Sequence, residues 1–341
     1  SPEVSDNFAT GSTAVSASNF QHLSVVDLSD GTQTVTGIDH GFSFNVIVNT
    51  NDTGDNGFRV AGNQGTLRQF VLNSNSIAGA NAARFVMQTS QNSSSGSNSW
   101  WTIQPMSALP DITDIQTTID GTVYTVQGNI INSNGSNFGG GLAGVDKIAI
   151  PPLNGKEIEI DSNGLEYVLR TSATAQGFSL KNIAFFNGGG TIGDTNAPVV
   201  INGQNFNLDN IVSGARADGS RPEDSSLNRR YGLVINASGT LKDSYIAYNG
   251  SGLLLTGNTI DVNRIIVLDN GIGPSGTDGN GVSIVSPAIS VTLRNSIVES
   301  NGGSHAGVTH GNGVYTQGDK LTLLENTTIV DSTASAISLN E

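Results

Sequence analysis

The sequence predicts an all-β protein, a parallel β-helix (solenoid) with a short helix-bearing cap near its N-terminus. One short strand pattern recurs six times between Phe178 and Leu339. A second alternating apolar segment, such as Gly232-Leu-Val-Ile, follows each copy. Helical spacing of apolar residues occurs convincingly in one place, which precedes all six copies. Irregular intervals between copies suit a solenoid whose coils share strands and differ in loop length.

Each copy reads apolar, any, apolar, any, Asn or Asp, and then an apolar pair. The Asn/Asp position is occupied by Asn182, Asn210, Asp243, Arg264, Asn295 and Asn326, of which Arg264 alone breaks the rule. A strand this short is stable only when it joins a sheet, with neighbouring strands about 4.8 Å apart. Stacked coils would bury a continuous core, predicted to contain Leu180, Ile183, Leu208, Ile211, Leu241, Val262, Ile265, Leu293, Ile297, Leu324 and Ile329.

Recurrent Asn at a turn predicts ladders of stacked side chains along the solenoid axis. Asn tolerates left-handed backbone, and its amide can bond the backbone or the Asn of the next coil. A second ladder is predicted at Asn187, Asn249, Asn270 and Asn301, each of which is followed by Gly. Because turn chemistry explains both sets of residues, we interpret them as structural rather than catalytic.

Composition limits the partners and the compartment. The 341 residues carry 15 Lys and Arg against 29 Asp and Glu, a net charge of −14, and no Cys. This balance argues against nucleic acid and anionic membrane surfaces, which need basic patches. The sequence contains no apolar run long enough to span a membrane. Its first residues, Ser-Pro-Glu with no Met, predict a processed or trimmed N-terminus.

Three regions are predicted. Residues 1–43 form an extended or strand segment that could contact another subunit, and residues 44–104 form a capping region with one helix. That helix should start near Thr66 and run for about ten residues, because Leu67, Phe70 and Val71 have helical spacing. Residues 105–341 form the β-helix. Two Ser/Asn/Gly-rich segments, 90–101 and 132–144, are predicted to be loops, the second a flexible lobe.

A resemblance to known families rests on three stretches. Val48-Asn-Thr-Asn-Asp-Thr-Gly54 and Gly65-Thr-Leu-Arg-Gln-Phe-Val-Leu-Asn-Ser-Asn75 resemble the CSLREA-type N-terminal module of bacterial secreted β-helix proteins. The chain departs from that module by lacking Cys before Leu67, by Gln69 where Glu is frequent, and by an insertion at 55–64. The downstream copies resemble the repeats of the pectin-lyase-like superfamily. The resemblance implies a right-handed helix and an extracellular or cell-surface location, but that superfamily has many functions.

Loops that follow the second Asn turn should emerge along one edge of the solenoid, and the very short loop at 250–251 should leave a saddle there. The flanking segment 214–230 is the most charged stretch of the chain. The resemblance implies that a Lys or Arg base beside a Ca²⁺-binding carboxylate could cleave acidic sugar polymers. Arg216, Asp218 and Arg221 are the catalytic candidates for such a site. The alternative is a solvated loop with internal ion pairs.

No cofactor is expected apart from Ca²⁺. Oxygen-rich turns at Asp52, Asp55, Asp161 and Asp278 are candidate Ca²⁺ ligands, although each equally fits a Gly/Asn/Asp turn.

Two functions are compatible with these features. The first is an extracellular or cell-surface structural solenoid without catalysis, either a filament or an adhesive passenger. The second is a lyase, hydrolase or epimerase acting on acidic glycans. Because no capping segment follows Ala336–Glu341, either residues have been removed or another copy covers this coil. In the second case, segment 1–44 of a neighbour would pair with it and propagate a filament. The expected partners are therefore other copies of the chain and glycans.

Overall fold

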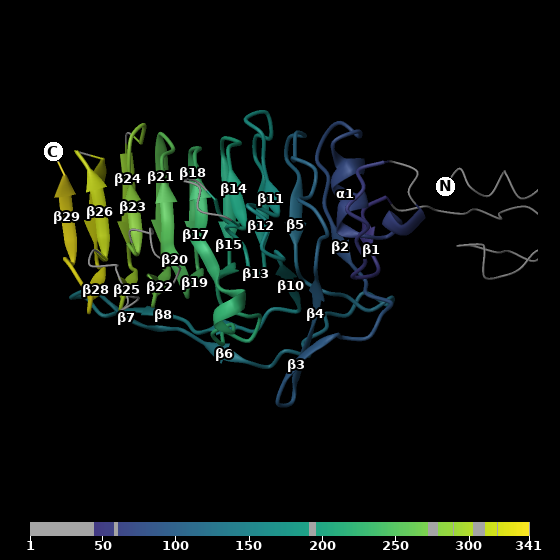
Figure 1. Cartoon of the computed structure of the whole chain (residues 1–341), viewed down its shortest axis with the longest axis horizontal. Coiled ribbons are helices and arrows are strands. Elements are labelled where there is room, and N and C mark those ends of the chain that lie inside the picture. Colours follow the sequence, from purple (N-terminus) through teal and green to yellow (C-terminus); the bar gives the residue numbers. More distant parts are fainter. Residues whose placement is uncertain are drawn as a thin grey trace, which may run out of the picture. The chain divides into compact units, whose positions relative to one another are not determined.

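The computed structural model of the chain describes residues 44–57, 61–190, 196–271, 279–288, 290–302, 311–318 and 320–340. The predicted N-terminal segment 1–43 therefore lies outside the described residues. Asn45–Glu341 forms one compact unit. Within it, three long sheets run side by side, and their strands follow one another in chain order from the cap to the last coil (Figure 1). This is a parallel β-helix, as the repeat pattern predicts.

Two sheets have seven strands each. The first contains β5 (Thr118–Asp120), β12 (Ser179–Lys181), β15 (Phe206–Asp209), β18 (Gly239–Lys242), β21 (Thr259–Asn263), β24 (Ser290–Arg294) and β27 (Leu321–Glu325). The second contains β11 (Leu169–Arg170), β14 (Val199–Ile201), β17 (Asn228–Ile235), β20 (Asn249–Leu255), β23 (Val282–Ile284), β26 (Val314–Gln317) and β29 (Ile337–Asn340). All pairings within both sheets are parallel.

The third sheet has nine strands. They are β3 (Ser93–Ser95), β4 (Asn98–Ile103), β10 (Ile158–Asp161), β13 (Ile183–Phe186), β16 (Val212–Ser213), β19 (Tyr245–Ala247), β22 (Ile266–Leu268), β25 (Ile297–Glu299) and β28 (Thr328–Val330). Only the β3–β4 pair is antiparallel in this sheet. The described residues also include two short 3-10 turns, Ala61–Asn63 and Asp224–Ser226.

The register of the strands places residues of the same type above one another in the core. Leu180 pairs with Leu208 and Leu208 with Leu241, and the same column continues through Val262, Leu293 and Leu324. The first five of these side chains are at most 1% exposed, while Leu324 is partly buried. Ile329 is likewise partly buried, and the other predicted core residues belong to the same cluster except Ile297. Ile297 packs on the outer face of the nine-stranded sheet instead.

The turn between β12 and β13 explains the repeated Asn. Asn182, Asn210, Asp243, Arg264, Asn295 and Asn326 all have positive φ, between 42° and 54°. Asn and Asp adopt this left-handed conformation at lower cost than most other residues. The sharp turn redirects the chain from a seven-stranded sheet into the nine-stranded one within a single residue, so the same residue type recurs in each coil.

The cap contains the one α-helix in the described part of the chain, α1 (Leu67–Ser74). Thr66 is its N-cap, and the Thr66 hydroxyl accepts a hydrogen bond from the Gln69 backbone N–H. Leu67, Phe70 and Val71 bury their side chains in the solenoid core. The prediction of a helix that starts near Thr66 is confirmed, with eight residues rather than ten. Strands β1 (Val46–Ile47) and β2 (Arg84–Phe85) pair beside it.

The segment predicted as a loop at 90–101 is instead a hairpin. Strand β4 pairs with β10, so the solenoid begins before residue 105. Adjacent residues of a strand point to opposite faces. Trp101 accordingly joins the main core while Trp100 joins the cluster on the outer face, and both are almost fully buried. The Ser-rich surroundings obscured the strand pattern.

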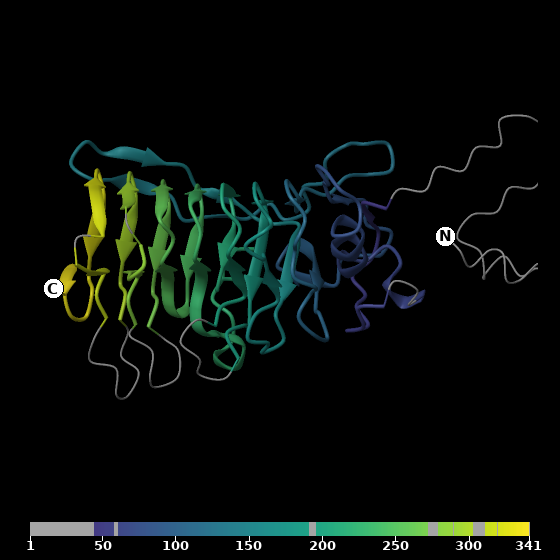
Figure 2. The same ribbon diagram turned by 90° about the horizontal axis from the view of Figure 1, so that it is seen from above.

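Residues 132–156 form an arm that packs along the outer face of the nine-stranded sheet (Figures 1 and 2). The arm contains two antiparallel pairs, β6 (Asn137–Phe138) with β9 (Leu153–Asn154) and β7 (Gly141–Ala143) with β8 (Ile148–Ile150). It covers an apolar stripe of the sheet that includes Ala184, Val212, Tyr245, Ile266 and Ile297. The prediction of a flexible lobe at 132–144 was therefore wrong, because the segment packs on the sheet and its glycines allow a close approach.

The arm approaches the sheet closely at its glycines. A Cβ on Gly144 would lie 2.3 Å from the Asn326 Cα, and Gly144 has φ of 63°. The Gly144 N–H donates to the Thr328 hydroxyl at 3.0 Å. Phe138 stacks edge-on against Tyr245, with ring centroids 5.3 Å apart. The arm therefore extends from the first coils as far as β28.

Candidate functional site

The first ladder runs through the positive-φ turns and has charged ends. The Asn210 amide donates to Asn182 Oδ1 at 2.6 Å, and the Asn182 amide donates to Asp120 Oδ1 at 2.8 Å. At the other end, Lys156 Nζ donates to Asn210 Oδ1 at 2.9 Å. Each amide accepts on one side and donates on the other. A carboxylate, which only accepts, therefore closes one end, and an amine that donates closes the other.

Further along the same row, one contact is an ion pair. Arg264 donates from Nε and Nη2 to the two carboxylate oxygens of Asp243, each at 2.6 Å. Arg264, which breaks the Asn/Asp rule, therefore continues the row by pairing with the Asp243 of the preceding coil. The Asn295 amide donates to Asn263 Oδ1 at 2.8 Å. Asn326 occupies the corresponding turn of the last described coil, with φ of 42°.

The second ladder is fully buried. Asn228 donates to Asn249, Asn249 to Asn270, and Asn270 to Asn301, with amide-to-oxygen distances between 2.7 and 2.9 Å. The predicted first member, Asn187, is not part of it. The Asn187 amide donates to Asp161 instead. With its positive φ, Asn187 is equivalent to Tyr248, which comes one residue before the ladder residue Asn249. Asn228, on β17, occupies this ladder position instead. The sequence did not indicate it, because Asn228 is followed by Arg229 and not by Gly.

Replacing Asn249 by Ala is expected to lower the free energy of unfolding by about 3 kcal/mol. The change removes the acceptor of the buried Asn228 amide and a donor to the Ser213 carbonyl, and each buried polar group left unpaired costs about 1–3 kcal/mol. Asn236→Ala is the matched control, because Asn236 also donates one ladder bond and accepts one but is half-buried. Urea unfolding of both variants measures the difference. Equal losses would contradict the role of burial.

A third ladder was not predicted. The Asn236 amide donates to Asn202 Oδ1 at 2.8 Å, the Asn202 amide donates to the Thr171 carbonyl at 2.7 Å, and the Thr256 hydroxyl donates to Asn236. All four residues directly follow a strand of the β11–β20 series or end it. The sequence does contain a pattern for this ladder, since an Asn or Thr follows Ile201, Ile235 and Leu255.

The charged segment 214–230 is attached to the nine-stranded sheet through Arg216. Arg216 donates two hydrogen bonds to Glu159, at 2.9 and 2.8 Å, and its guanidinium lies 4.5 Å from the centroid of the Phe186 ring. Glu159 is fully buried and also accepts from the Ala217 N–H and the Thr102 hydroxyl. Arg216 therefore anchors this segment to the outer face of β10.

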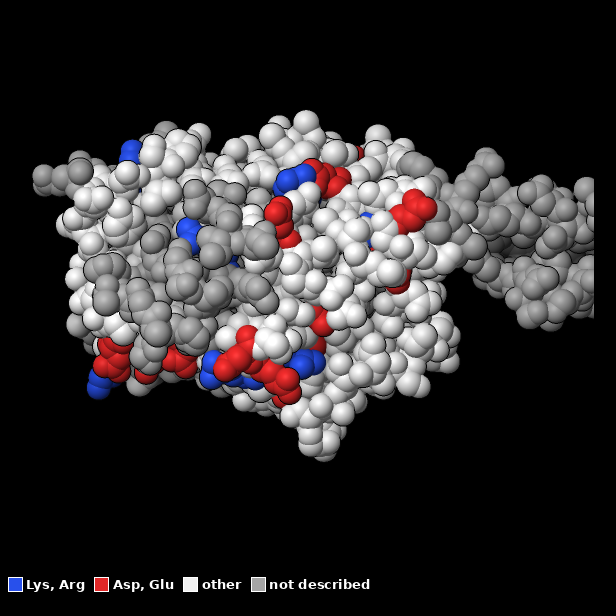
Figure 3. Space-filling model, viewed as in Figure 1, with Lys and Arg blue, Asp and Glu red and all other residues white. Residues whose placement is uncertain are grey.

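The other two catalytic candidates have local partners. Asp218 accepts from the N–H and the hydroxyl of Ser220, and exposed Arg221 pairs with exposed Asp224. Basic and acidic side chains alternate in one patch low on the face drawn in Figure 3. The structure does not bring Arg216 and Arg221 together around a shared carboxylate: each binds a different acid. Of the two pairs, only that of Arg221 with Asp224 lies within the segment, since Glu159 belongs to β10.

The candidate Ca²⁺ ligands are dispersed and already bonded. Asp52 binds Arg68, Asp55 accepts from the Gly57 N–H, and Asp161 accepts from Asn187 and Gln104. Asp278 lies outside the described residues. Among the residues that the structure describes, no group of three or more His, Asp and Glu side chains could hold a metal ion.

Arg68, in α1, is the most completely bonded side chain of the cap. Its guanidinium donates to both carboxylate oxygens of Asp52, to Asn56, and to the carbonyls of Ser107 and Ala108. These five contacts use all five N–H donors of the side chain. Arg68 and Asp52 are both buried, with side-chain exposures of 0% and 3%. The pair ties the helix to the turn before it and to the segment after β4.

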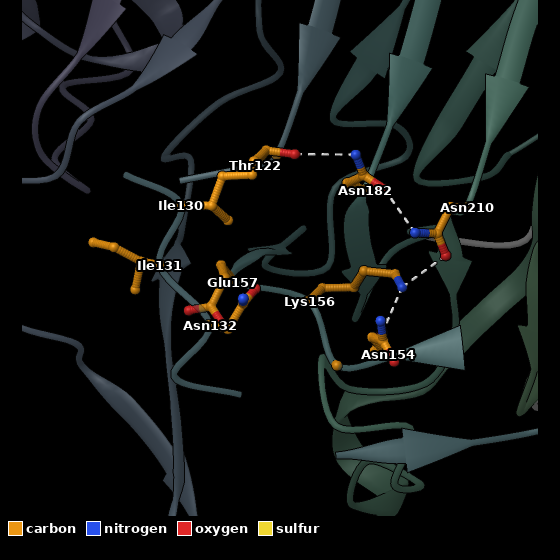
Figure 4. Close-up of a pocket in the computed structure, with 11 residues that line it drawn as sticks. Thr122, Ile130, Ile131, Asn132, Asn154, Lys156, Glu157, Asn182 and Asn210 are labelled. Atoms are coloured by element: carbon orange, nitrogen blue, oxygen red, sulfur yellow. Dashed lines mark hydrogen bonds between the residues drawn. The ribbon is translucent and has the colours of Figure 1, made fainter. Parts of the chain in front are cut away.

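A pocket of about 180 Å³ lies beside the first ladder (Figure 4). Its walls come from the segment after β5, the end of the arm and two rungs of the ladder. It is lined by Gly121, Thr122, Ile130, Ile131, Asn132, Asn154, Gly155, Lys156, Glu157, Asn182 and Asn210. This pocket was not predicted, because its residues are far apart in the sequence and Lys156 and Glu157 follow no recognisable motif.

Lys156 is the distinctive group of the pocket. It is 2% exposed, and its Nζ donates to the Asn154 carbonyl at 2.6 Å as well as to Asn210. Burial lowers the pKa of Lys156 from its ordinary value to about 7. Glu157 is also buried, but its carboxylate accepts hydrogen bonds from the Ser133 hydroxyl and the Asn134 N–H. The pocket therefore holds an amine that can exist neutral or charged near neutral pH.

Comparison of the chain with protein-family models, with curated proteins and with solved structures gives no match. Within the described ranges, no helix has the length and apolar character needed to cross a membrane. The class of protein defined by fold and site is thus a parallel β-helix with internal polar ladders.

Proposed function

We propose that the chain is an extracellular or cell-surface structural solenoid without catalysis, which assembles with other copies into filaments or serves as an adhesive passenger. The observation that carries the proposal is the use of polar side chains. Many Asn, Asp and Arg side chains in the regular coils form ladders and ion pairs that run along the axis, and such contacts stiffen a solenoid. The net charge of −14 adds solubility.

The proposal includes kinship with the pectin-lyase-like superfamily and with the CSLREA-type module. The parallel coils support the first. The second is supported by Arg68 of the Leu67-Arg68-Gln69 stretch. The five hydrogen bonds of Arg68 explain why a cap of this kind needs Arg at that position.

A lyase, hydrolase or epimerase acting on acidic glycans is the second candidate function. It is tested by incubating the protein with polymers of uronic acids, with and without Ca²⁺. We expect no turnover, because Arg216 and Arg221 are each engaged by a carboxylate. Turnover that is lost in Arg216→Lys or Arg221→Ala, with folding intact, would replace the structural proposal by the enzymatic one.

Assembly with other copies is proposed to involve apolar side chains that are exposed on the solenoid. Leu339 in β29, which is 72% exposed, is the one chosen for the test. Light scattering over increasing concentration is expected to show association that Leu339→Glu weakens. Leu142→Glu, on the exposed part of the arm, is the control and should have no effect. A chain that stays monomeric at all concentrations, or equal effects of both variants, would contradict this mode of assembly.

A further inference from the structure

Lys156 differs from the cations that the structure pairs with an acidic side chain. Arg68, Arg170, Arg216, Lys242, Arg264 and Arg294 each bind an Asp or Glu side chain. In the described part of the chain, Lys156 has no ion pair, and its Nζ bonds two neutral oxygens. Buried charges in proteins are normally paired. The pocket beside Lys156 is therefore a place where a countercharge is missing.

The hydrogen-bonding capacity of the pocket is also incomplete. Lys156 Nζ has three donor positions and uses two of them on oxygens of the protein. Asn132 and Asn154 line the pocket, are exposed, and bond no partner through their side-chain amides within the described residues. Glu157 is the other titratable group of the lining, and both of its oxygens already accept hydrogen bonds.

Apolar surface completes the lining. Ile130 and Ile131 line the pocket together with the polar groups, as Figure 4 shows, and Ile130 is 59% exposed. The Phe138 ring centroid lies 5.8 Å from Lys156 Nζ. Small-ligand sites typically combine apolar walls with a few polar groups that orient the ligand. The volume of about 180 Å³ admits a molecule of only a few heavy atoms.

We propose that this pocket binds a small organic carboxylate with a short hydrocarbon part, whose carboxylate completes the bonds of Lys156 Nζ. The amides of Asn132 and Asn154 would donate to the same anion, and the two isoleucines would contact its hydrocarbon part. This inference is independent of the structural role, since a solenoid can carry a binding site on its surface.

Binding of an anion should be linked to proton uptake. The pKa of free Lys156 is about 7, so at pH 8 most of the amine is neutral. An opposite charge in contact favours the protonated form and raises the pKa. Complex formation at pH 8 is therefore expected to take up close to one proton per site.

Isothermal titration calorimetry of the full chain with sodium butyrate tests the proposal. Titrations at pH 8 in Tris and in triethanolamine, at constant ionic strength set with NaCl, give the proton uptake from the dependence on buffer. We expect saturable binding of one butyrate with proton uptake. Butyramide has nearly the same shape without the charge, and it should bind at least tenfold more weakly.

Two pairs of variants locate the site. Lys156→Gln should weaken butyrate binding at least tenfold, whereas Lys147→Gln, at an exposed position of the arm, should leave it unchanged. Ile130→Glu places a negative charge in the lining and should weaken binding by a similar factor without altering Lys156. Val126→Glu, which is 71% exposed in the same segment but does not line the pocket, is its control.

The proposal is overturned if butyrate gives no saturable heat, if butyramide binds equally well, or if Ile130→Glu and Val126→Glu have the same effect. Should Lys156→Gln fail to fold, the second pair of variants and the measured proton uptake still decide the outcome. None of these results depends on whether the chain assembles into filaments.

Discussion

Replacing Arg68 by Met is expected to lower the free energy of unfolding by about 3–5 kcal/mol, the range observed when one partner of a buried ion pair is removed. Asp52 would then hold a carboxylate that is 3% exposed and faces no cation. The carbonyls of Ser107 and Ala108 would also lose their donors. The cap depends on this one side chain, because it links three separate segments there.

Arg170→Met is the matched control. Arg170 binds Asp111 through the same two guanidinium atoms, Nε and Nη2, but both side chains are more than a third exposed. Water replaces such contacts, so the expected loss is at most about 1 kcal/mol. Urea unfolding followed by fluorescence of Trp100 and Trp101, in the neighbouring strand β4, measures both variants. Similar losses for the two would refute the argument from burial.

A second large effect concerns Lys156 and pH. Folding lowers the pKa of Lys156 from 10.5 to about 7. Between these two pH values the unfolded chain binds more protons than the folded chain, so stability rises with pH. Below pH 7 both states hold the proton, and the full cost of burying the charge is present. The stability of the wild type relative to Lys156→Gln should therefore increase by roughly 5 kcal/mol from pH 7 to 10.5, at about 1.4 kcal/mol per pKa unit.

Urea unfolding of the wild type and of Lys156→Gln at intervals between pH 6 and 10.5 measures this difference. Subtracting one curve from the other removes the contributions of groups that titrate in both proteins. Lys147→Gln, at an exposed position of the arm, is the control for the removal of one positive charge. A flat difference for Lys156→Gln would show that its pKa is not lowered by folding.

The solenoid could be predicted because its signal is local and repeated. The column from Leu180 to Leu293 and the turn residues from Asn182 to Asn326 recur in each coil, so any one copy predicts the next. The helix after Thr66 was predictable for the same reason, since its cap and its buried face lie within one short window. These features depend on neighbours in the sequence.

The arm and the pocket could not be predicted, because they depend on contacts between distant residues. Nothing next to Gly144 in the sequence indicates Thr328, and nothing next to Lys156 indicates Asn210. The Gly- and Ser-rich composition of the arm resembles that of a free loop. Asn187 was misplaced by a single residue for a related reason: the Asn-Gly signal marks a turn but not which side chain faces the ladder.

The arm also bears on how the solenoid comes apart. Coils that touch only their neighbours can be lost one at a time from an end, as in a row of independent units. The hydrogen bond from Gly144 to Thr328 joins residues 184 positions apart, and the arm packs on strands from several coils between them. Fraying of the last coils would thus be opposed by attachment to the first ones. The arm should therefore make unfolding of the solenoid more cooperative than the loss of one coil at a time.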